Sequence, residues 1–357
     1  MDTSRADPRH PGQPVAATAP GAPRPRLTPA RADVRRAVRA AFNSLPPGTL
    51  PPGALVLVAL SGGADSLALA AATAFEAPGA QLRAGAVIVD HGLQADSAAV
   101  AERAAAQARE LGLDPVLIRR VEVIESGEGP EAAAREARYA ALRRARTETG
   151  AALVLLGHTL DDQAETVLLG LARGSGAASL AGMPAQSGEF LRPLLGLSRD
   201  TTRAACRDQG LQWWDDPQNT DQRYLRVRVR ERILPMLEAE LGPGVAEALV
   251  RTAEQFREDE AAFAAQIDEF IEEVVEPAEA GIALSLGVLK ANPAALRQRI
   301  IRYVVLSEFG VSLSRAHTLE VARLVTDWHG QGPLTLPGLT AHRAAGRIVF
   351  QASQESE

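Results

Sequence analysis

Residues 61–66 read Ser-Gly-Gly-Ala-Asp-Ser and lie between an apolar stretch, 54–60, and a helix predicted near 64–77. Glycines let backbone N–H groups approach an anion closely, and a helix N-terminus carries a partial positive charge. The two serines add hydroxyl donors. The segment therefore predicts a phosphate-binding turn, whose candidate binding residues are Ser61, Gly62, Gly63, Ala64, Asp65 and Ser66.

This turn differs from the two common nucleotide-binding motifs. It lacks the lysine of G-x-x-x-x-G-K-[ST] and the glycine spacing of G-x-G-x-x-G. Asp65 would repel a bare phosphate, so we interpret its carboxylate as a ligand of a bridging Mg²⁺ or as a catalytic group. The simpler alternative is a glycine turn followed by an Asp or Ser helix cap that binds no ligand.

A second group of polar side chains follows another apolar stretch and opens the next predicted helix. It comprises His158, Asp161, Asp162 and Glu165. Ligands of open parallel sheets bind at the carboxyl ends of the strands, so these side chains are expected close to the phosphate-binding turn. Asp162 and Glu165 are three residues apart and share a helix face, where they could hold Mg²⁺ or an ammonium group.

Each of these side chains also has a purely structural interpretation. Carboxylates in the first turn of a helix stabilise it by matching the helix dipole. His158 could orient a phosphate, or it could only hydrogen-bond at the end of a strand. The local pattern alone does not favour one interpretation over the other.

Arginine is concentrated in two runs, 135–146 and 223–232. Each run contains five arginines and one glutamate, which leaves a local net charge of +4. Only one of the 38 basic residues, Lys290, is a lysine, so nearly every cationic contact uses a guanidinium, which suits bidentate phosphate binding. The runs could meet RNA phosphates, or they could form solvated helix faces.

The elements that must position these groups alternate between short apolar stretches and helical ones. Continuous apolar strands that alternate with helices indicate a parallel sheet covered on both faces. Strands are predicted at 54–60, 84–90, 115–123 and 152–158, and helices near 64–77, 97–111, 130–148, 161–172 and 198–209. We therefore predict an α/β fold in this part of the chain.

The polar segment 210–222 is predicted to be a loop that carries Trp213 and Trp214. Such a loop could hold an extruded base, although we expect at least one of the two tryptophans to pack in the core. The chain after the loop is predicted to be mostly helical. Helices are expected at 223–239 with a break or kink at Pro235, at 245–275 between two domains, at 293–308 and at 313–327.

The length of 357 residues favours about two domains. We assign 1–45 to a disordered tail and a short basic helix at 31–44. Residues 46–240 are assigned to a nucleotide-binding catalytic domain. Residues 241–357 are assigned to a smaller α-rich domain that ends in a β-hairpin.

Composition excludes several classes of protein. The sequence has no apolar run of about 18 residues and no apolar signal core near its start, so we expect no membrane partner. Its single cysteine, Cys206, cannot form an internal disulfide or a cysteine-rich zinc site, which favours a cytoplasmic location. The net charge of −6 argues against a protein that coats nucleic acid, and the excess of acidic residues lies after residue 240.

An ordered set of strings resembles one family. The phosphate-binding turn is similar to the loop of ATP enzymes that adenylate a substrate and release pyrophosphate. Further strings resemble the tRNA(Ile)-lysidine synthetase branch: VDHGL at 89–93, AREARY at 134–139, GHTLDDQAET at 157–166, RGSG at 173–176, LAGMP at 180–184 and RPLL at 192–195. The resemblance covers about residues 54–239 and continues weakly through LRQR at 296–299 and LPG at 336–338.

The resemblance implies an adenine nucleotide alpha hydrolase-like fold and a ligase that uses ATP and Mg²⁺. The implied substrates are free L-lysine and an isoleucine tRNA with a CAU anticodon. ATP would adenylate the C2 oxygen of the first anticodon cytidine and expel pyrophosphate. The lysine ε-amine would then attack C2, giving lysidine and AMP. The oligomeric state is left open, with a homodimer as one option.

The resemblance also carries residue roles. The implied catalytic residues are Asp65, Arg138, His158, Asp162 and Arg230, and the implied metal ligands are Asp65 and Asp162. The sequence departs from the family pattern at two positions. Thr159 stands where the family usually has a second histidine, and Val227 stands where it commonly has asparagine.

Three other functions compete with this interpretation. Thiolation of a tRNA base would need more than the single Cys206. An amidotransferase, such as a GMP or NAD synthetase, would need an ammonia source, for which the chain has little room. A non-catalytic ATP-binding or tRNA-binding module would be favoured if Asp65, Ser66 or Asp162 were missing, but all three are present.

Overall fold

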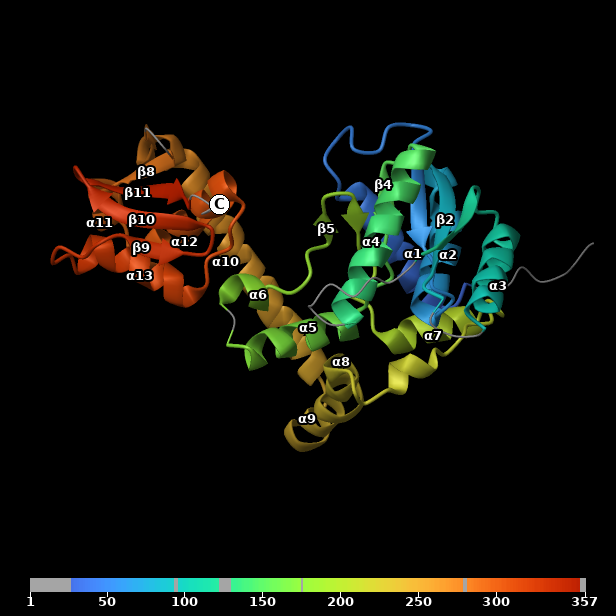
Figure 1. The fold of residues 1–357 in the computed structure, drawn as a ribbon. Coiled ribbons are helices and arrows are strands. Elements are labelled where there is room, and N and C mark those ends of the chain that lie inside the picture. The colour runs from blue at the N-terminus through green and yellow to red at the C-terminus, as the bar shows by residue number, and fades with distance from the viewer. Residues whose placement is uncertain (1–26, 93–95, 122–129, 175, 279–280, 354–357) are drawn as a thin grey trace, which may run out of the picture.

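A computed structural model of the chain describes residues 27–92, 96–121, 130–174, 176–278 and 281–353. These residues form two lobes joined by one long helix (Figure 1). Most of the predicted disordered tail, residues 1–26, lies outside the described residues.

The first lobe contains a six-stranded sheet in the order β3-β2-β1-β4-β6-β5. Its strands are β1 (Leu55–Ala59), β2 (Arg83–Asp90), β3 (Val116–Arg120), β4 (Leu153–Leu155), β5 (Gln186–Ser187) and β6 (Phe190–Leu191). All neighbouring strands are parallel except β5, which runs antiparallel to β6 at the edge. The predicted parallel sheet is confirmed.

Helices cover both faces of this sheet. Val56 and Val58 of β1 face one core, and Leu55 and Leu57 face the other, which explains why the strand is apolar at every position. The helices of the first core are α1 (Pro29–Asn43), α2 (Ala64–Glu76), α3 (Ser97–Glu110) and α7 (Arg199–Arg207). The helix of the second core is α4 (Pro130–Thr149).

Helix α1 packs into the first lobe, although we assigned its residues to a segment outside the domain. Val34, Val38 and Phe42 are four residues apart, so they share one helix face and are buried against the core. On the same side, Arg35 Nε and Arg39 Nε each lie 2.8 Å from a carboxylate oxygen of Glu76 in α2. Two of the arginines that make this helix basic are therefore paired with the buried carboxylate of Glu76.

The strand order creates a switch point beside β1. The chain passes from β1 outward to β2 and β3, then returns to β4 on the other side of β1. The carboxyl ends of β1 and β4 are therefore neighbours, and each leads into a helix N-terminus. The approach is close: a Cβ at Gly157 would lie 3.2 Å from the backbone carbon of Asp65, so a larger residue would crowd the start of α2.

The remaining helices of the first lobe follow β4 in the chain. They are α5 (Leu160–Ala172), α6 (Ala177–Leu180), a 3₁₀ turn (Pro217–Thr220), α8 (Leu225–Arg228), a π-helical turn (Val229–Ile233) and α9 (Leu234–Leu241). The predicted irregularity near Pro235 is present as the π-helical turn just before it. Proline cannot donate a backbone hydrogen bond and crowds the preceding turn, which favours such a widening.

The second lobe contains an antiparallel sheet in the order β7-β8-β11-β10-β9. Its strands are β7 (Val275–Ala278), β8 (Gly281–Ser285), β9 (Leu334–Leu336), β10 (Leu339–Ala344) and β11 (Arg347–Ala352). Its helices are α11 (Leu286–Ala291), α12 (Ala294–Phe309) and α13 (Arg315–Thr326). The sequence indicated α12, α13 and the terminal hairpin, but not α11 or the full sheet.

Helix α10 (Val245–Val274) joins the two lobes. Its 30 residues span about 45 Å at the usual helical rise. Val250 packs with Ala164 and Val229 of the first lobe, whereas Ile267 and Val274 belong to the core of the second. Among the residues described, no helix combines the length and apolarity needed to cross a bilayer.

Candidate active site

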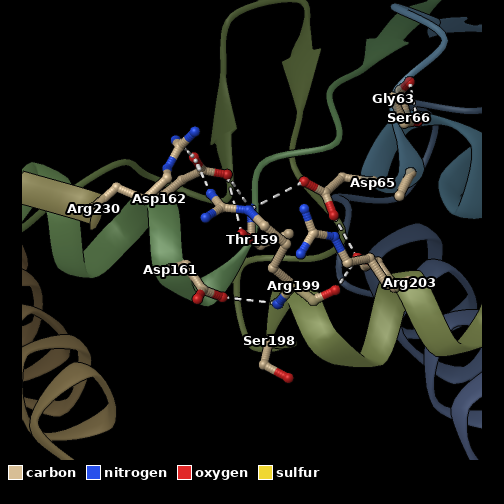
Figure 2. Close-up of polar contacts among 12 residues, drawn as sticks. Gly63, Asp65, Ser66, Thr159, Asp161, Asp162, Ser198, Arg199, Arg203 and Arg230 are labelled. Atoms are coloured by element: carbon tan, nitrogen blue, oxygen red, sulfur yellow. Dashed lines mark hydrogen bonds and ion pairs between the residues drawn. The ribbon is translucent and has the colours of Figure 1, made fainter. Parts of the chain in front are cut away.

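The predicted phosphate-binding turn forms the N-terminus of α2 (Figure 2). Gly62 has φ +84°, a left-handed conformation that strongly favours glycine. The Ser66 hydroxyl fixes the turn, because Ser61 N donates to it over 3.1 Å and it donates to Gly63 O over 3.0 Å. The backbone N–H groups at the start of α2 therefore border a preformed anion-binding turn.

Asp65 points from this turn towards α7 (Figure 2). The Thr202 hydroxyl donates a hydrogen bond to it, and Arg199 Nε lies 3.6 Å from its Oδ2. Burial raises the pKa of the Asp65 carboxyl, and the contacts from Thr202 and Arg199 only partly oppose this effect. Burial therefore disfavours the ionised form of Asp65, a situation that is common for functional groups.

Asp162 is positioned by the N-terminus of α5. Thr159 is the N-cap residue, and its backbone N and its hydroxyl lie 2.9 Å and 3.1 Å from Asp162 Oδ2. Thr159 thus fixes this carboxylate directly. Burial alone would raise the pKa of Asp162, but the positive charges of Arg199 and Arg226 and the hydrogen bond from Thr159 N together hold it below the usual range.

Three guanidinium groups converge on Asp162 and Glu165. Arg226 Nε and Arg230 Nε each lie 2.7 Å from a carboxylate oxygen of Glu165. Arg199 Nη2 lies 3.2 Å from Asp162 Oδ1 and 3.4 Å from Glu165 Oε1. Arg199 also contacts Asp65, so the three guanidinium groups are shared among three carboxylates, and Arg199 links this cluster to the phosphate-binding turn.

Arg199 and Arg226 were missed from the sequence. Arg226 lies four residues before Arg230, so the two share a helix face, and this spacing was the available signal. Arg199 gave no such signal, because it starts a different helix, 37 residues after Asp162. Only the fold shows that its side chain bridges Asp65 and Asp162.

His158 and Arg138 line the same side of the site. Burial, together with Arg138, Arg192 and Arg226, lowers the pKa of His158 to about 3, so its imidazole is neutral at physiological pH. His158 Nδ1 is buried without a hydrogen-bond partner. Burial also lowers the pKa of Arg138, which lies too far from any carboxylate of the described residues to form an ion pair.

A single cavity of about 870 Å³ brings these groups together. Of the predicted site residues, Gly62 belongs to the turn but does not line the cavity. The predicted residues that line it are Ser61, Gly63, Ala64, Asp65, Ser66, Arg138, His158, Asp162 and Arg230. The phosphate-binding turn and the arginine cluster thus border one space.

The loop with the two tryptophans closes one side of this cavity. Trp214 lines the cavity, and its backbone N donates to Gly62 O over 2.9 Å. Trp213 packs against the core of the first lobe, as expected for at least one member of the pair. Trp214 is therefore the ring available for stacking against a base or adenine.

Cys206 lies beneath the phosphate-binding turn, where its thiol donates to Ala64 O over 3.2 Å. Burial raises its pKa to about 12, so the residue is a thiol rather than a reactive thiolate at neutral pH. This placement gives no support to a sulfur-transfer role for Cys206.

The carboxylates fit a Mg²⁺ ion that arrives with a nucleotide. Asp65 and Asp162 already share one cation, the Arg199 guanidinium, so both reach the same space. No group of three or more His, Cys, Asp or Glu side chains suited to a metal occurs among the described residues. Protein-bound Mg²⁺ is often held by one or two carboxylates plus substrate phosphates, and this arrangement matches that pattern.

Comparisons with known proteins agree with this geometry. Residues 33–237 match the family model described as a PP-loop domain, and residues 284–349 match the model described as a TilS substrate binding domain. A tRNA(Ile)-lysidine synthase of Leifsonia xyli is 63% identical over 305 residues, which are 85% of this chain and 92% of that protein. The enzyme of the same name from Streptomyces coelicolor is 52% identical and covers 85% of this chain and 86% of its own.

The fold also resembles a solved structure. The U34-tRNA thiolase NcsA from Methanococcus maripaludis, solved with its [4Fe-4S] cluster, superposes with a TM-score of 0.52. The match covers 64% of this chain and 80% of that one at 20% identity, so it supports the fold alone.

Proposed function

The chain belongs to the tRNA(Ile)-lysidine synthase family, and on that premise we propose that it joins free L-lysine to C2 of the first anticodon cytidine of tRNA(Ile). It is an ATP-using ligase that acts on tRNA. One observation carries the finer proposal: the phosphate-binding turn and the Asp162–Glu165 arginine cluster face one cavity and are bridged by Arg199.

In the proposed first step, the C2 oxygen of the cytidine attacks the α-phosphate of ATP, and pyrophosphate leaves. The turn at the α2 N-terminus would hold the leaving pyrophosphate, because its backbone N–H groups and serine hydroxyls are fixed before ATP binds. Negative charge grows on the phosphoryl oxygens during this step. Arg199 and Arg230 are preorganised by Glu165 and would stabilise that charge.

In the proposed second step, the lysine ε-ammonium group loses a proton to solvent, the resulting free amine attacks C2, and AMP leaves. Asp162 would bind the incoming ammonium group, since its low pKa keeps it ionised and makes it a good acceptor but a weak base. Neutral His158 has an unpartnered Nδ1, which would accept a hydrogen bond from the base or donate one to it. Arg138 lines the same cavity and would contact the adenylate or the tRNA.

Asp65 and Asp162 are the residues that would hold Mg²⁺ together with the nucleotide phosphates. The ion would supply charge neutralisation at the phosphates. The Arg199 guanidinium contacts both carboxylates, so its side chain must move before Mg²⁺ could bind between them. We also propose a cytoplasmic location, where ATP, lysine and tRNA are all present.

The test is a turnover assay with the full chain, Mg²⁺, labelled ATP, labelled lysine and a tRNA(Ile) transcript with a CAU anticodon. Lysine label should enter the tRNA with one AMP and one pyrophosphate per lysine. A methionine tRNA with the same anticodon serves as the control acceptor and should remain unlabelled.

The alternative outcomes separate the parts of the proposal. AMP formation without lysine incorporation would keep the adenylation step and reject lysine as the nucleophile. Absence of both products would favour a non-catalytic binding module. Sedimentation of the same preparation tests the homodimer that the family resemblance allows.

A further inference from the structure

A second cavity, of about 380 Å³, lies beside the active-site cavity. It is formed between α4 and the β5–β6 hairpin. Arg135 of α4 lines both cavities, so the two spaces adjoin at this side chain. A chain that reaches the active site could therefore continue past Arg135 into the second cavity.

The second cavity carries a surplus of positive charge. Arg135, Arg143 and Arg192 line it together with one carboxylate, Glu189. Arg143 Nε is paired with Glu189 Oε1 at 2.7 Å, which leaves the charges of Arg135 and Arg192 unbalanced. The cavity thus suits an anion.

Arg192 is the least exposed of these cations. Arg192 is only 8% exposed, and its Nη1 donates a hydrogen bond to Pro184 O over 3.0 Å. Its Nε has no hydrogen-bond partner, and no carboxylate of the described part of the chain lies within ion-pair distance of it. A buried guanidinium without an anion is costly, so a ligand that supplies one would relieve that cost.

Two aromatic rings complete the cavity and orient its arginines. Tyr139 and Phe190 meet edge to face with their centroids 4.9 Å apart. Arg135 Cζ lies 4.9 Å from the Tyr139 ring centre, and Arg143 Cζ lies 5.5 Å from the Phe190 ring centre. Such contacts hold guanidinium groups in fixed positions, where they can donate to a phosphate.

We propose that this second cavity binds a backbone phosphate of the tRNA anticodon loop next to the modified cytidine. The inference rests on the proposed function, because it assumes that tRNA enters the adjoining cavity. A phosphodiester matches the unbalanced positive charge, and the half-buried ring of Tyr139 could contact a neighbouring base. The site would position the tRNA chain and would not touch the reacting atoms.

The test compares Arg143→Gln with the matched control Arg144→Gln. Both changes remove one positive charge from an exposed position of α4, but Arg143 lines the second cavity and Arg144 lines neither cavity. Arg143→Gln should weaken binding of the tRNA(Ile) transcript by roughly tenfold and reduce the slope of log Kd against log salt by about 0.7. Arg144→Gln should bind this transcript as the wild type does.

To locate the contact, each anticodon-loop phosphate is replaced in turn by a neutral methylphosphonate, and binding of the modified tRNA is measured. One such substitution should weaken binding to the wild type and have no further effect on Arg143→Gln. Equal effects in both proteins would overturn the proposal, as would equal tRNA binding by the two arginine variants. Weaker ATP binding by Arg143→Gln alone would also overturn it, by assigning the cavity to the nucleotide. Wild-type lysine incorporation, measured in parallel, shows whether the proposed function itself holds.

Discussion

Arg230 and Glu165 form a bidentate ion pair across 65 residues of chain, with Nε 2.7 Å from Oε1 and Nη2 3.0 Å from Oε2. Glu165 has no exposed surface, so its charge depends entirely on protein partners. The pair ties the π-helical turn to α5 and fixes where Arg230 enters the cavity. We infer that Glu165 is a positioning residue for the arginines around it.

Glu165→Gln should therefore lower stability, because it leaves buried guanidinium groups without their counter-charge. Breaking a buried pair of this kind costs about 3 kcal/mol, which corresponds to a fall in Tm of about 6–10 °C for the first lobe. The measurement is thermal unfolding followed by near-UV circular dichroism.

The control for this prediction is Glu148→Gln. Glu148 pairs with Arg119 at 2.6 Å, but both side chains are at least one third exposed, so the loss should be below about 1 kcal/mol. Equal shifts of Tm in the two variants would contradict the role of Glu165.

The sequence predicted the site better than it predicted the contacts within it. Residues 61–66 and 157–165 follow neighbouring strands, so strand order alone brings them together. Periodicity could not reveal that Arg199 bridges Asp65 and Asp162, because this contact depends on where α7 packs. The apolar stripe of α1 was present in the sequence, but its arginines suggested an exposed helix.

The sheet of the second lobe was also only partly predictable. β10 and β11 are adjacent in the chain and show the spacing of a hairpin. β8 pairs with β11 from more than 60 residues away, and its five residues are too few to distinguish a strand from a helix by periodicity. Long-range pairing of this kind is not encoded in local sequence.

Asp162→Asn should reduce lysine incorporation by roughly 100- to 1,000-fold, since it removes the charge that would hold the lysine ammonium group. Asparagine keeps an oxygen that can accept the hydrogen bond from Thr159 N, so the N-cap of α5 survives. Single-turnover incorporation of labelled lysine is the measurement.

Asp162→Ala provides the comparison. It should be as inactive as Asp162→Asn but melt at a lower temperature, because it also removes the capping contact, which is worth about 1 kcal/mol. Both variants should keep the wild-type far-UV spectrum. Activity within twofold of the wild type in either variant would refute a role for Asp162 in the reaction.

Asp65→Asn should raise Tm by roughly 1–3 °C while abolishing pyrophosphate release. Burial raises the pKa of Asp65, so the ionised group costs stability above its folded pKa. The amide removes that cost and can still accept from Thr202. The advantage should be complete at neutral pH and shrink as the pH falls and the wild-type Asp65 becomes protonated. A Tm below that of the wild type at pH 7.5 would show that the Arg199 contact outweighs burial.

Comparing the wild type with His158→Gln isolates the contribution of the His158 imidazole to the pH dependence of stability. The folded pKa of about 3 lies below the ordinary value of 6.5, so the unfolded chain binds more protons between these limits. Relative to the variant, the wild type should therefore lose stability as the pH falls below 6.5. At pH 5 the loss should reach about 1–2 kcal/mol, and above pH 7 it should vanish. The measurement is Tm of both proteins from pH 7.5 to pH 5. A difference in Tm that stays constant over this range would mean that His158 is protonated alike in the folded and unfolded states, and that it is not held neutral beside Asp162.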